Sequence, residues 1–462
     1  MLKRVLIANR GEIALRILRA CRELGIETVA AYSTADADAL HVQLADQAVC
    51  IGPARAAESY LNQTALLAAA TGTGCDALHP GYGFLSENAD FADACVQAGL
   101  TFIGPSGDTI RKAGSKSAAR TLMEQAGVPV TPGSDGPVAD AQSALVAAEQ
   151  VGYPVLLKAS SGGGGRGIRR VDRPADLPAA LAQAQAEAQA CFGDGEMYLE
   201  KLVLRPRHVE FQIFADRHGN VIHLGDRDCS VQRRNQKLIE EAPSPALSPE
   251  LRERMGEAAV RAAQAVDYEN AGTVEFLLSD TGDFYFMEIN TRIQVEHGVT
   301  ELITGVDLVR EQLLVASGLP LSVKQEDICL TGCSMECRIN AEDVSRNFQP
   351  CPGTVGFLHF PGGNGVRVDS CMYNGCVLPP YYDSMVAKLL VHAPNRKEAI
   401  LRMRRCLEEF NLTGFATNAE LSYQILYHPE FVEGSCTTAF LDEHLDTLLA
   451  WNRLVTEQEA NA

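Results

Sequence analysis

The sequence has no pair of cysteines in a Cys-x-x-Cys arrangement, although it contains 14 cysteines in 462 residues. Cys329, Cys333 and Cys337 are evenly spaced, but they lie in a segment that we expect to be extended. A structural zinc site is therefore not expected. We predict that the cysteines are reduced and structural, which indicates a cytosolic protein.

Long apolar runs are also absent. No uninterrupted apolar segment reaches the length that a membrane-spanning helix needs. The first four residues, Met-Leu-Lys-Arg, lead directly into the apolar segment Val5–Ala8, without the pattern of a secretory signal peptide. The sequence therefore predicts a cytoplasmic protein without a membrane partner.

An excess of positive charge is lacking as well. The chain has 40 Lys and Arg against 59 Asp and Glu, which gives a net charge of −19. This charge excludes a general surface for nucleic acid or anionic membranes, so any anionic substrate must be held by local basic clusters. With 46% hydrophobic and 21% charged residues, the composition is that of a soluble globular protein, and the length predicts two to four domains.

Residues 4–32 predict a strand, a helix and a second strand, and therefore a parallel α/β sheet. Ile13, Ile17, Cys21 and Leu24 form the apolar stripe of the helix. Arg16, Arg19 and Glu23 lie off this stripe, on a solvated face or at a subunit contact. The connecting turn has no Gly-x-Gly-x-x-Gly motif, which disfavours a nicotinamide site.

Two segments rich in proline divide the rest of the chain. Residues 130–137 precede a small module that we expect to end near residue 204, and residues 242–246 precede a helix and a hairpin. Residues from about 333 to the end predict a β-rich unit finished by helices. The chain is thus predicted to be α/β in its first part and mixed α and β overall.

The hairpin predicted over residues 272–290 carries the most specific chemistry. If Thr281-Gly282 forms a two-residue turn, Asp280 pairs with Asp283 and Glu275 lies directly opposite Glu288. Carboxylates in this position repel each other, because their Cβ atoms are about 5 Å apart. A divalent cation held by Glu275, Glu288 and Asn290 is the simplest way to relieve that repulsion, and magnesium with a nucleotide is the usual reason for such a site.

Polar residues continue at alternate positions after this hairpin. If the strand extends to Glu296, then Arg292, Gln294 and Glu296 project from the same face as Glu288 and Asn290. A surface strand would show the same alternation.

A glycine-rich segment, Ser160–Gly167, follows the short apolar strand that ends at Lys158. It is a flexible linker or a flap between two strands, whose backbone N–H groups would wrap phosphate oxygens. It is not a P-loop, because it has no Gly-Lys-Ser/Thr and no helix directly after it.

Three further groups of polar residues have an ordinary interpretation. Glu200 and Lys201 are a surface pair at the end of a strand, and Glu210 and Gln212 face water from an alternating strand. A larger set is expected to form a solvated ion-pair network; its members are Asp226, Arg227, Asp228, Arg233, Arg234, Lys237, Glu240 and Glu241.

Taken together, these segments resemble a known family. The lysine strand with GGGGRG, the Glu275/Glu288/Asn290 trio and RIQVEH are similar to the ATP-grasp enzymes, and within them to biotin carboxylase. IANRGEIALRILRA, HPGYGFLSEN, DCSVQRRNQK, ECRINAED and PPYYDSM resemble that family's motifs in their usual order, so the resemblance covers about residues 2–445. It implies a Rossmann-like pre-ATP-grasp domain at 1–114 and an ATP-grasp domain at 115–330 with a mobile lid at about 131–203. A β-rich carboxy-terminal domain at 331–447 and a tail at 448–462 would follow.

The resemblance also implies the roles of individual residues. The nucleotide-binding positions are Lys116, Lys158, Gly164, Gly165, Glu200, Lys201, Leu202, Val203, His208, Asn235 and Glu275. The magnesium or manganese ligands are Glu275, Glu288 and Asn290. Bicarbonate is held by Lys237, Arg292, Gln294 and Val295, and Glu296 is the general base. Arg338 faces the ureido oxygen of biotin, with Tyr82 and Asp383 nearby. Asn235 departs from the family pattern, which usually has His there, and Ser161 and Gly298 depart from a glycine and a proline.

The implied activity is ATP-dependent carboxylation of biotin on a carrier protein through carboxyphosphate, with two metal ions, in acetyl-CoA carboxylase and fatty acid synthesis. The sequence contains no Met-Lys pair, so the Met-Lys-Met site of biotin attachment is absent. The carrier and the carboxyltransferase are therefore expected as separate chains, and the protein as a homodimer. The alternatives are the corresponding subunit of a carboxylase for pyruvate or another acyl-CoA, and a non-catalytic ATP-binding regulatory subunit.

Overall fold

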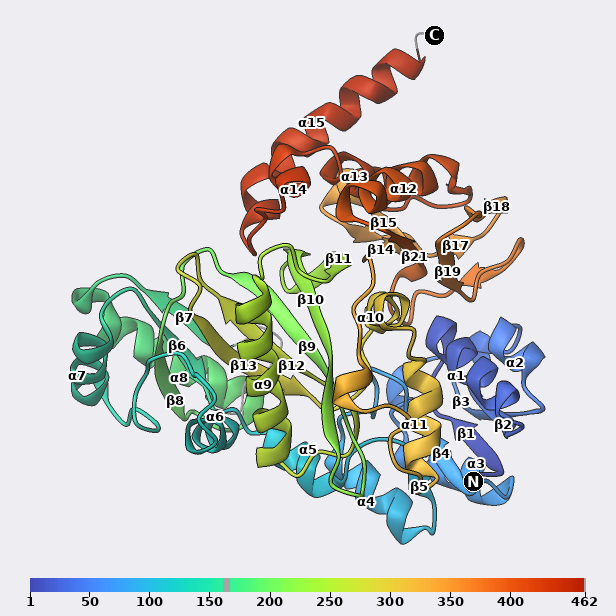
Figure 1. The fold of residues 1–462 in the computed structure, drawn as a ribbon, viewed down its shortest axis with the longest axis horizontal. Coiled ribbons are helices and arrows are strands. Elements are labelled where there is room, and N and C mark those ends of the chain that lie inside the picture. The colour runs from blue at the N-terminus through green and yellow to red at the C-terminus, as the bar shows by residue number, and fades with distance from the viewer. Residues whose placement is uncertain (161–166, 461–462) are drawn as a thin grey trace.

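The amino-terminal part of the chain forms a five-stranded parallel sheet in the order β3-β2-β1-β4-β5. The computed structural model describes residues 1–160 and 167–460 (Figure 1). The strands are β1 (Arg4–Ile7), β2 (Glu27–Ser33), β3 (Gln47–Gly52), β4 (Ala77–His79) and β5 (Thr101–Phe102). The helices between and after them are α1 (Gly11–Glu23), α2 (Leu40–Leu44), α3 (Gln63–Gly72), α4 (Ala89–Gln97) and α5 (Gly107–Gly114), with short 3₁₀ turns η1 (Thr34–Asp36) and η2 (Ala56–Glu58).

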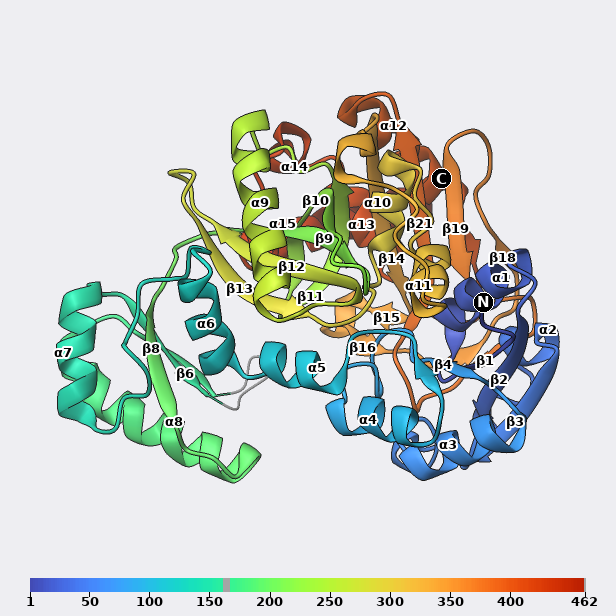
Figure 2. The same ribbon diagram turned by 60° about the horizontal axis from the view of Figure 1, so that its bottom comes forward.

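The predicted strand-helix-strand opening is confirmed by β1, α1 and β2. Ile13 and Ile17 of α1 are buried, and they belong to the same apolar cluster as Val5 and Ile7 of β1. The helix ends before Gly25, whose φ of +70° is a left-handed conformation that costs glycine little. Figure 2 shows this sheet with its helices at one end of the molecule.

Arg16 of α1 departs from the expectation of a solvated face or a subunit contact. Its guanidinium is buried and donates to Glu301 Oε1 at 2.8 Å and to Asp307 Oδ1 at 2.5 Å. Arg19 and Glu23, by contrast, are exposed as expected. The spacing of residues in α1 could not reveal this contact, because both partners lie nearly 300 positions away.

A separate three-stranded sheet, ordered β7-β6-β8, forms the small module (Figures 1 and 2). Its strands are β6 (Val155–Ala159), β7 (Ile168–Val171) and β8 (Met197–Lys201), and its helices are α7 (Ala141–Val151), α8 (Leu177–Phe192) and the turn η3 (Pro174–Asp176). α6 (Lys116–Gln125) precedes it. β6 and β7 are antiparallel neighbours, which confirms that the glycine-rich segment joins two strands.

The central element is an eight-stranded antiparallel sheet in the order β13-β12-β9-β10-β11-β14-β21-β19. Its strands are β9 (Arg207–Ala215), β10 (Val221–Arg233), β11 (Gln236–Ala242), β12 (Asn270–Leu278), β13 (Phe284–Asn290), β14 (Cys333–Asn340), β19 (Val366–Ser370) and β21 (Met385–Ala393). The β11–β14 pairing joins segments about 100 residues apart, so one sheet crosses residue 331, where we expected a domain boundary.

Helices pack on the central sheet and also form the end of the chain. They are α9 (Pro249–Ala265), α10 (His297–Thr304), α11 (Leu308–Ala316), α12 (Arg396–Glu409), α13 (Ala419–Ile425), α14 (Pro429–Glu433) and α15 (Phe440–Ala460), with turns η4 (Gln325–Asp327) and η5 (Val344–Arg346). Short antiparallel pairs complete the β-rich unit: β15 (Glu342–Asp343) with β16 (Gln349–Pro350), β17 (Gly353–Thr354) with β20 (Val377–Leu378), and β18 (Leu358–His359) with β22 (Asn411–Leu412). The predicted α/β fold class is thus confirmed.

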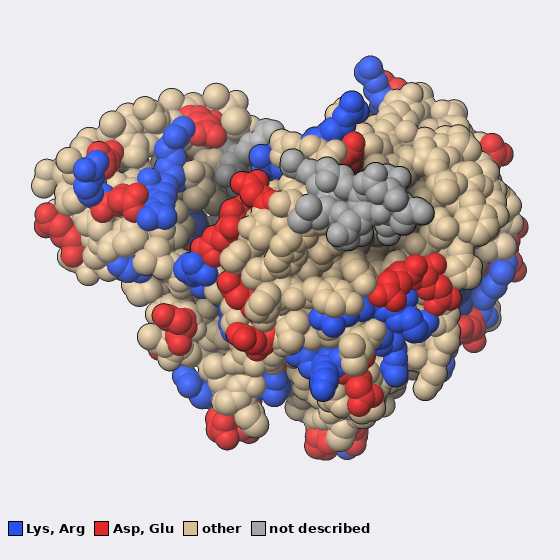
Figure 3. Space-filling model, turned by 90° about the horizontal axis from the view of Figure 1, so that it is seen from above, with Lys and Arg blue, Asp and Glu red and all other residues tan. Residues whose placement is uncertain are grey.

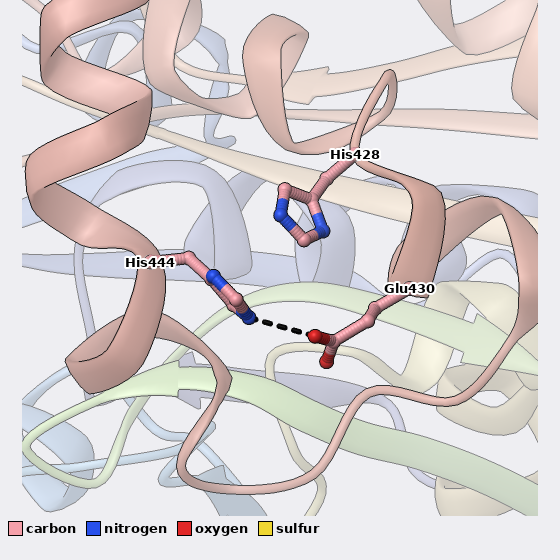
Figure 4. Close-up of side chains that lie close together, drawn as sticks. All are labelled: His428, Glu430 and His444. Atoms are coloured by element: carbon pink, nitrogen blue, oxygen red, sulfur yellow. Dashed lines mark hydrogen bonds and ion pairs between the residues drawn. The ribbon is translucent and has the colours of Figure 1, made fainter.

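Two histidines link the last two helices, α14 and α15. His444 Nε2 lies 2.8 Å from Glu430 Oε1, and the His428 ring packs against His444 and Phe440 (Figure 4). The contact holds α15 against the segment around α14.

The described residues contain no helix that is both long and apolar enough to cross a membrane. All 14 cysteines have free thiols. On the face shown in Figure 3, basic and acidic side chains are interspersed rather than gathered into a basic patch, as the net charge of −19 leads one to expect.

Candidate active site

The β12–β13 hairpin has the pairing that the sequence predicts at its polar end. Glu275 lies opposite Glu288 and Thr273 lies opposite Asn290. The predicted turn, however, is wrong, because the strands shift register between Glu275 and Phe276 and Met287 is an extra residue in β13.

The turn itself is one residue longer than the predicted one. Ser279 N–H donates to Asp283 O at 2.8 Å, so residues 280–282 form the turn and Asp280 does not pair with Asp283. Gly282 has a φ of +85°, the left-handed conformation typical of a three-residue hairpin. The longer turn and the bulge compensate each other, which is why the register at Glu275 was nevertheless correct.

The predicted extension of β13 to Glu296 is also wrong, because the strand ends at Asn290 and α10 begins at His297. The intervening segment still keeps its polar residues together. Gln294 Nε2 donates to Glu275 Oε1 at 2.8 Å, and Arg292 Nη2 donates to Asn290 Oδ1 at 3.1 Å. The irregular backbone between β13 and α10 therefore keeps Arg292 and Gln294 beside the polar residues of the hairpin, as a continued strand would have done.

Arg292 has a second partner, which the sequence did not reveal. Its Nε donates to Glu87 Oε2 at 3.0 Å, and Thr291 N–H donates to Glu87 Oε1 at 3.3 Å. Glu87 ends the HPGYGFLSE stretch of the amino-terminal domain. The glycines in that stretch mark a shaped loop, but nothing in the sequence says which residue it meets.

Lys237 of β11 lies at the centre of the site. Its buried ammonium is 2.6 Å from Glu210 Oε2, 3.0 Å from Glu275 Oε1 and 2.6 Å from Glu296 Oε1. Burial disfavours the charged form, but the surrounding anionic groups, these carboxylates among them, raise the pKa of Lys237 well above its usual value. Lys237 is thus a permanent cation that three carboxylates share.

Glu296 lies between two cations. Its Oε1 accepts from Lys237, and its Oε2 accepts from Arg338 Nη2 at 2.8 Å. Burial alone would raise the pKa of Glu296, but Lys237, Arg338 and the nearby Arg227 hold it well below the usual value. Glu296 is therefore ionised, and a substrate proton can reach a carboxylate rather than a carboxylic acid.

The position of Arg227 of β10 contradicts the expected solvated ion-pair network. Its side chain is fully buried. Nε donates to Glu210 at 2.5 Å, and Nη1 donates to Gln212 at 2.8 Å. The other contacts are Nη1 to Thr300 Oγ1 at 2.9 Å, Nη2 to Thr273 Oγ1 at 3.1 Å and Nη2 to Gln294 Oε1 at 2.8 Å.

Glu210 and Gln212 are also fully buried, so the expectation that they face water is wrong. Asp226, Asp228, Glu240 and Glu241 are buried as well, and of the predicted network only Arg234 is exposed and Arg233 half-buried. The alternation of polar and apolar residues in β9 and β10 reflects a polar interior between the sheet and α10, not solvent.

In the small module, the expectation that Glu200 and Lys201 form a surface pair is likewise wrong. Glu200 is buried and accepts a hydrogen bond from Lys158, with Arg120 Nη1 at 3.6 Å from its other oxygen. Lys201 Nζ donates to the carbonyls of Gly152 and Tyr153 at 2.8 and 2.9 Å.

The other predicted nucleotide positions lie in different settings. His208 Nε2 is 3.1 Å from Glu275 Oε2, which joins the nucleotide and metal positions. Leu202 and Val203 directly follow β8, and Asn235 is exposed in the turn between β10 and β11. Lys116 is the first residue of α6, and Gly164 and Gly165 lie outside the described residues.

The predicted biotin positions lie near one another. Tyr82 hydrogen-bonds Glu12, and burial and this carboxylate raise the pKa of Tyr82 well above its usual value. Asp383 adds to this rise and Arg338 opposes it. The backbone carbonyl of Val295 accepts from Lys388 Nζ at 2.8 Å.

Glu275, Glu288 and Asn290 offer carboxylate and amide oxygens at one end of the hairpin, and this donor set suits Mg²⁺. Asn290 Nδ2 is buried and has no partner among the described residues, so the amide is not fully engaged. The repulsion between Glu275 and Glu288 is, however, partly relieved by the protein itself, through Lys237 and His208. A metal is therefore compatible with the site but is not its only source of positive charge.

Three family descriptions match consecutive parts of the chain. They are the biotin carboxylase amino-terminal domain over residues 1–110, the ATP-binding domain of the carbamoyl-phosphate synthase L chain over residues 115–324, and the biotin carboxylase carboxy-terminal domain over residues 336–443. The chain belongs to the biotin carboxylase family. It is thus an ATP-grasp ligase that forms carbon–nitrogen bonds, as the resemblance implied.

Curated relatives extend over nearly the whole chain. Biotin carboxylase 1 of Bacillus subtilis (strain 168) is 55% identical over 445 residues, which cover 96% of this chain and 99% of that protein. A pyruvate carboxylase subunit from Methanothermobacter thermautotrophicus is 51% identical and covers 99% of this chain and 93% of its own length. The chain is therefore similar in sequence both to a protein named biotin carboxylase and to a pyruvate carboxylase subunit.

Solved structures agree with this assignment. A biotin carboxylase complex with β,γ-ATP from Campylobacter jejuni has a TM-score of 0.93 at 48% identity and covers 96% of this chain and 99% of its own. The biotin carboxylase domain dimer of Hydrogenobacter thermophilus 2-oxoglutarate carboxylase, with MgADP, ADP and bicarbonate, has a TM-score of 0.91 at 49% identity, with coverages of 97% and 99%.

Proposed function

We propose that this protein carboxylates biotin on a carrier protein, using ATP and bicarbonate and passing through carboxyphosphate. The observation that carries the proposal is the buried Glu296 carboxylate held between Lys237 and Arg338. This arrangement places a base between two fixed cations, which is what the deprotonation and binding of a small anion require.

In the first step, Lys237, Arg292, Gln294 and the backbone of Val295 hold bicarbonate. Glu296 takes the bicarbonate proton while a bicarbonate oxygen bonds to the γ-phosphorus. The bond between that phosphorus and the bridging β,γ-oxygen breaks, and ADP leaves. Arg292 suits this anion because its planar guanidinium matches a planar oxyanion, and Glu87 fixes its orientation.

The nucleotide is held by residues of the three-stranded sheet and of the central eight-stranded sheet. We assign Lys158, Glu200 to Val203, His208 and Glu275 to this role, together with Lys116, Asn235, Gly164 and Gly165. Glu275, Glu288 and Asn290 would hold Mg²⁺ or Mn²⁺, which when bound neutralises phosphate charge. The support is the oxygen donor set of the hairpin and the nucleotide and MgADP complexes of the similar solved structures.

In the second step, carboxyphosphate breaks into carbon dioxide and phosphate. Phosphate takes the proton of the biotin ureido nitrogen, and that nitrogen bonds to the carbon of carbon dioxide. Arg338 stabilises the negative charge on the ureido oxygen, and Tyr82 and Asp383 border the same position. The electrostatic effects of Arg338 and Asp383 on Tyr82 support a shared pocket.

We propose that the carboxyl group passes to acetyl-CoA, for fatty acid synthesis, through separate carrier and carboxyltransferase chains, and that the protein is a cytoplasmic homodimer. The similar Hydrogenobacter thermophilus structure is a dimer. A second candidate is the same half-reaction in a pyruvate carboxylase, which the 51% identical pyruvate carboxylase subunit favours. Identifying the carboxyltransferase that copurifies with this protein distinguishes them.

The test is ADP release by the purified protein with ATP, Mg²⁺, bicarbonate and free biotin, in which each substrate is omitted in turn. We expect turnover that depends on both bicarbonate and biotin and is lost in Glu296→Gln, which keeps the side chain's shape without its charge. Glu253→Gln, at an exposed position of α9, is the matched control. ATP binding without any bicarbonate- and biotin-dependent turnover would support a regulatory subunit instead.

A further inference from the structure

Two buried carboxylates face each other behind Arg338. Glu240 of β11 and Glu336 of β14 are directly opposite in the antiparallel ladder, and both are fully buried. Directly opposite side chains have Cβ atoms about 5 Å apart and project from the same face. Arg338, two positions beyond Glu336, projects from this face too. The proposed function assigns a role to Arg338 but none to Glu240 and Glu336.

The hydrogen bonds around this pair are incomplete. Glu240 Oε1 accepts from Arg338 Nε at 2.6 Å, whereas Glu240 Oε2 has no donor among the described residues. Neither oxygen of Glu336 has a donor within that same part of the chain. Three acceptor oxygens thus lie together in the interior without a donor, which is costly for carboxylates.

The nearest cation on the neighbouring strand is already engaged. Lys388 of β21, opposite Arg338, donates to Val295 O at 2.8 Å and lies 3.1 Å from Glu12 Oε1 and 3.7 Å from Asp369 Oδ2. Lys388 therefore supplies a positive potential at Glu336 but no hydrogen bond.

We propose that Glu240 and Glu336 share one proton, so that Glu336 is a neutral acid whose O–H donates to the Glu240 carboxylate. The proton supplies the donor that the three oxygens lack. It also leaves one negative charge instead of two behind Arg338, and Arg338 then keeps its charge for the ureido oxygen. Glu336 is a positioning residue, and this inference rests on the proposed role of Arg338.

The electrostatic surroundings agree with this assignment. Burial, opposed by Arg338, raises the pKa of Glu240 to about 7, and burial together with neighbouring carboxylates raises the pKa of Glu336 well above its usual value. The charged groups that surround the pair are Lys237 of β11, Glu296 before α10, Arg338 of β14, Lys388 of β21, and Arg367 and Asp369 of β19. On α10, His297 is kept neutral because burial and nearby cations hold its pKa well below the usual value.

The first test does not depend on catalysis. Infrared difference spectra of wild type against Glu336→Gln at pH 7 should show the carbonyl band of a protonated carboxyl group in wild type only. The mid-point temperature of thermal unfolding of wild type should also fall relative to that of Glu336→Gln as the pH rises. The reason is that a native group with a raised pKa holds a proton that the unfolded chain lacks, so its stabilisation is lost at higher pH.

The second test uses the reaction. Glu336→Gln keeps a donor for Glu240, so we expect it to retain most of the biotin-dependent rate. We expect the wild-type rate to decline as the pH rises and the shared proton leaves, and Glu336→Gln to lack this decline. Glu336→Leu offers no donor, and we expect its KM for biotin to rise about tenfold, while its biotin-independent ATP hydrolysis is unchanged.

The outcomes separate this inference from the proposed function. Without the infrared band in wild type, or with Gln and Leu variants that are equally impaired, the shared proton is refuted. If wild type shows the band but no biotin-dependent turnover, the proposed function fails and the shared proton stands.

Discussion

Replacing Arg227 by Met removes the cation that organises the interior of the site. The Met side chain fills part of the same space, but five acceptors lose their donor: Glu210, Gln212, Thr273, Gln294 and Thr300. Removing one partner of a buried ion pair costs about 3–5 kcal/mol. Because Lys237 still neutralises Glu210 at 2.6 Å, we expect the lower end of that range, about 3 kcal/mol.

This loss converts into a measurable temperature shift. At about 2.1 cal/mol/K per residue, the unfolding entropy of a chain of 462 residues is about 1 kcal/mol/K, so about 3 kcal/mol lowers the mid-point temperature by about 3 °C. The assay is thermal unfolding, followed by circular dichroism. Arg227→Lys, which keeps the charge but has fewer donors, should fall between wild type and Arg227→Met.

Arg227→Met should also impair the reaction selectively. Gln294 loses the donor that fixes its carbonyl oxygen, so the KM for bicarbonate should rise more than the KM for ATP. Arg310→Met, at an exposed position of α11, is the matched control. An Arg227→Met protein as stable as this control, with an unchanged KM for bicarbonate, would refute the argument that the buried guanidinium organises the site.

Three further predictions concern separate parts of the molecule. Burial opposes ionisation of Asp36, but hydrogen bonds from Arg10 and Tyr60 lower its pKa. Asp36→Asn should therefore destabilise the protein at pH 7, and the destabilisation should shrink as the pH falls through that lowered pKa. Thermal unfolding at several pH values checks this. Glu288→Gln should raise the magnesium concentration needed for turnover while circular dichroism stays unchanged, and an unchanged magnesium dependence would count against the metal site. Cys229→Ala should retain turnover, because burial raises the pKa of this thiol well above its usual value and leaves it neutral.

Local periodicity predicted those parts of the site that depend on neighbouring residues in the sequence. The β-α-β opening follows from apolar spacing in α1, and Glu275 opposite Glu288 follows from alternation in two adjacent strands. The turn was wrong by one residue, but the bulge at Met287 restored the register. Neither the bulge nor the longer turn changes the alternation that carried the prediction.

Burial of polar residues could not be predicted in the same way. Glu210, Gln212 and Arg227 alternate with apolar neighbours, and the same alternation is typical of a strand with one face in water. Only the packing of α10 and the pairing of β11 with a strand about 100 residues away turn that face into an interior. Contacts such as Arg292 with Glu87 likewise depend on segments that no local pattern connects.

The most direct test of the central claim follows the oxygen atoms of bicarbonate. If a bicarbonate oxygen attacks the γ-phosphorus and carboxyphosphate then loses carbon dioxide, that oxygen stays with phosphate. With ¹⁸O-labelled bicarbonate, mass spectrometry of the product should therefore find one labelled oxygen transferred into each phosphate formed in the biotin-dependent reaction. Phosphate without label from bicarbonate would mean that water attacks ATP, and would contradict the role proposed for Glu296 and its two cations.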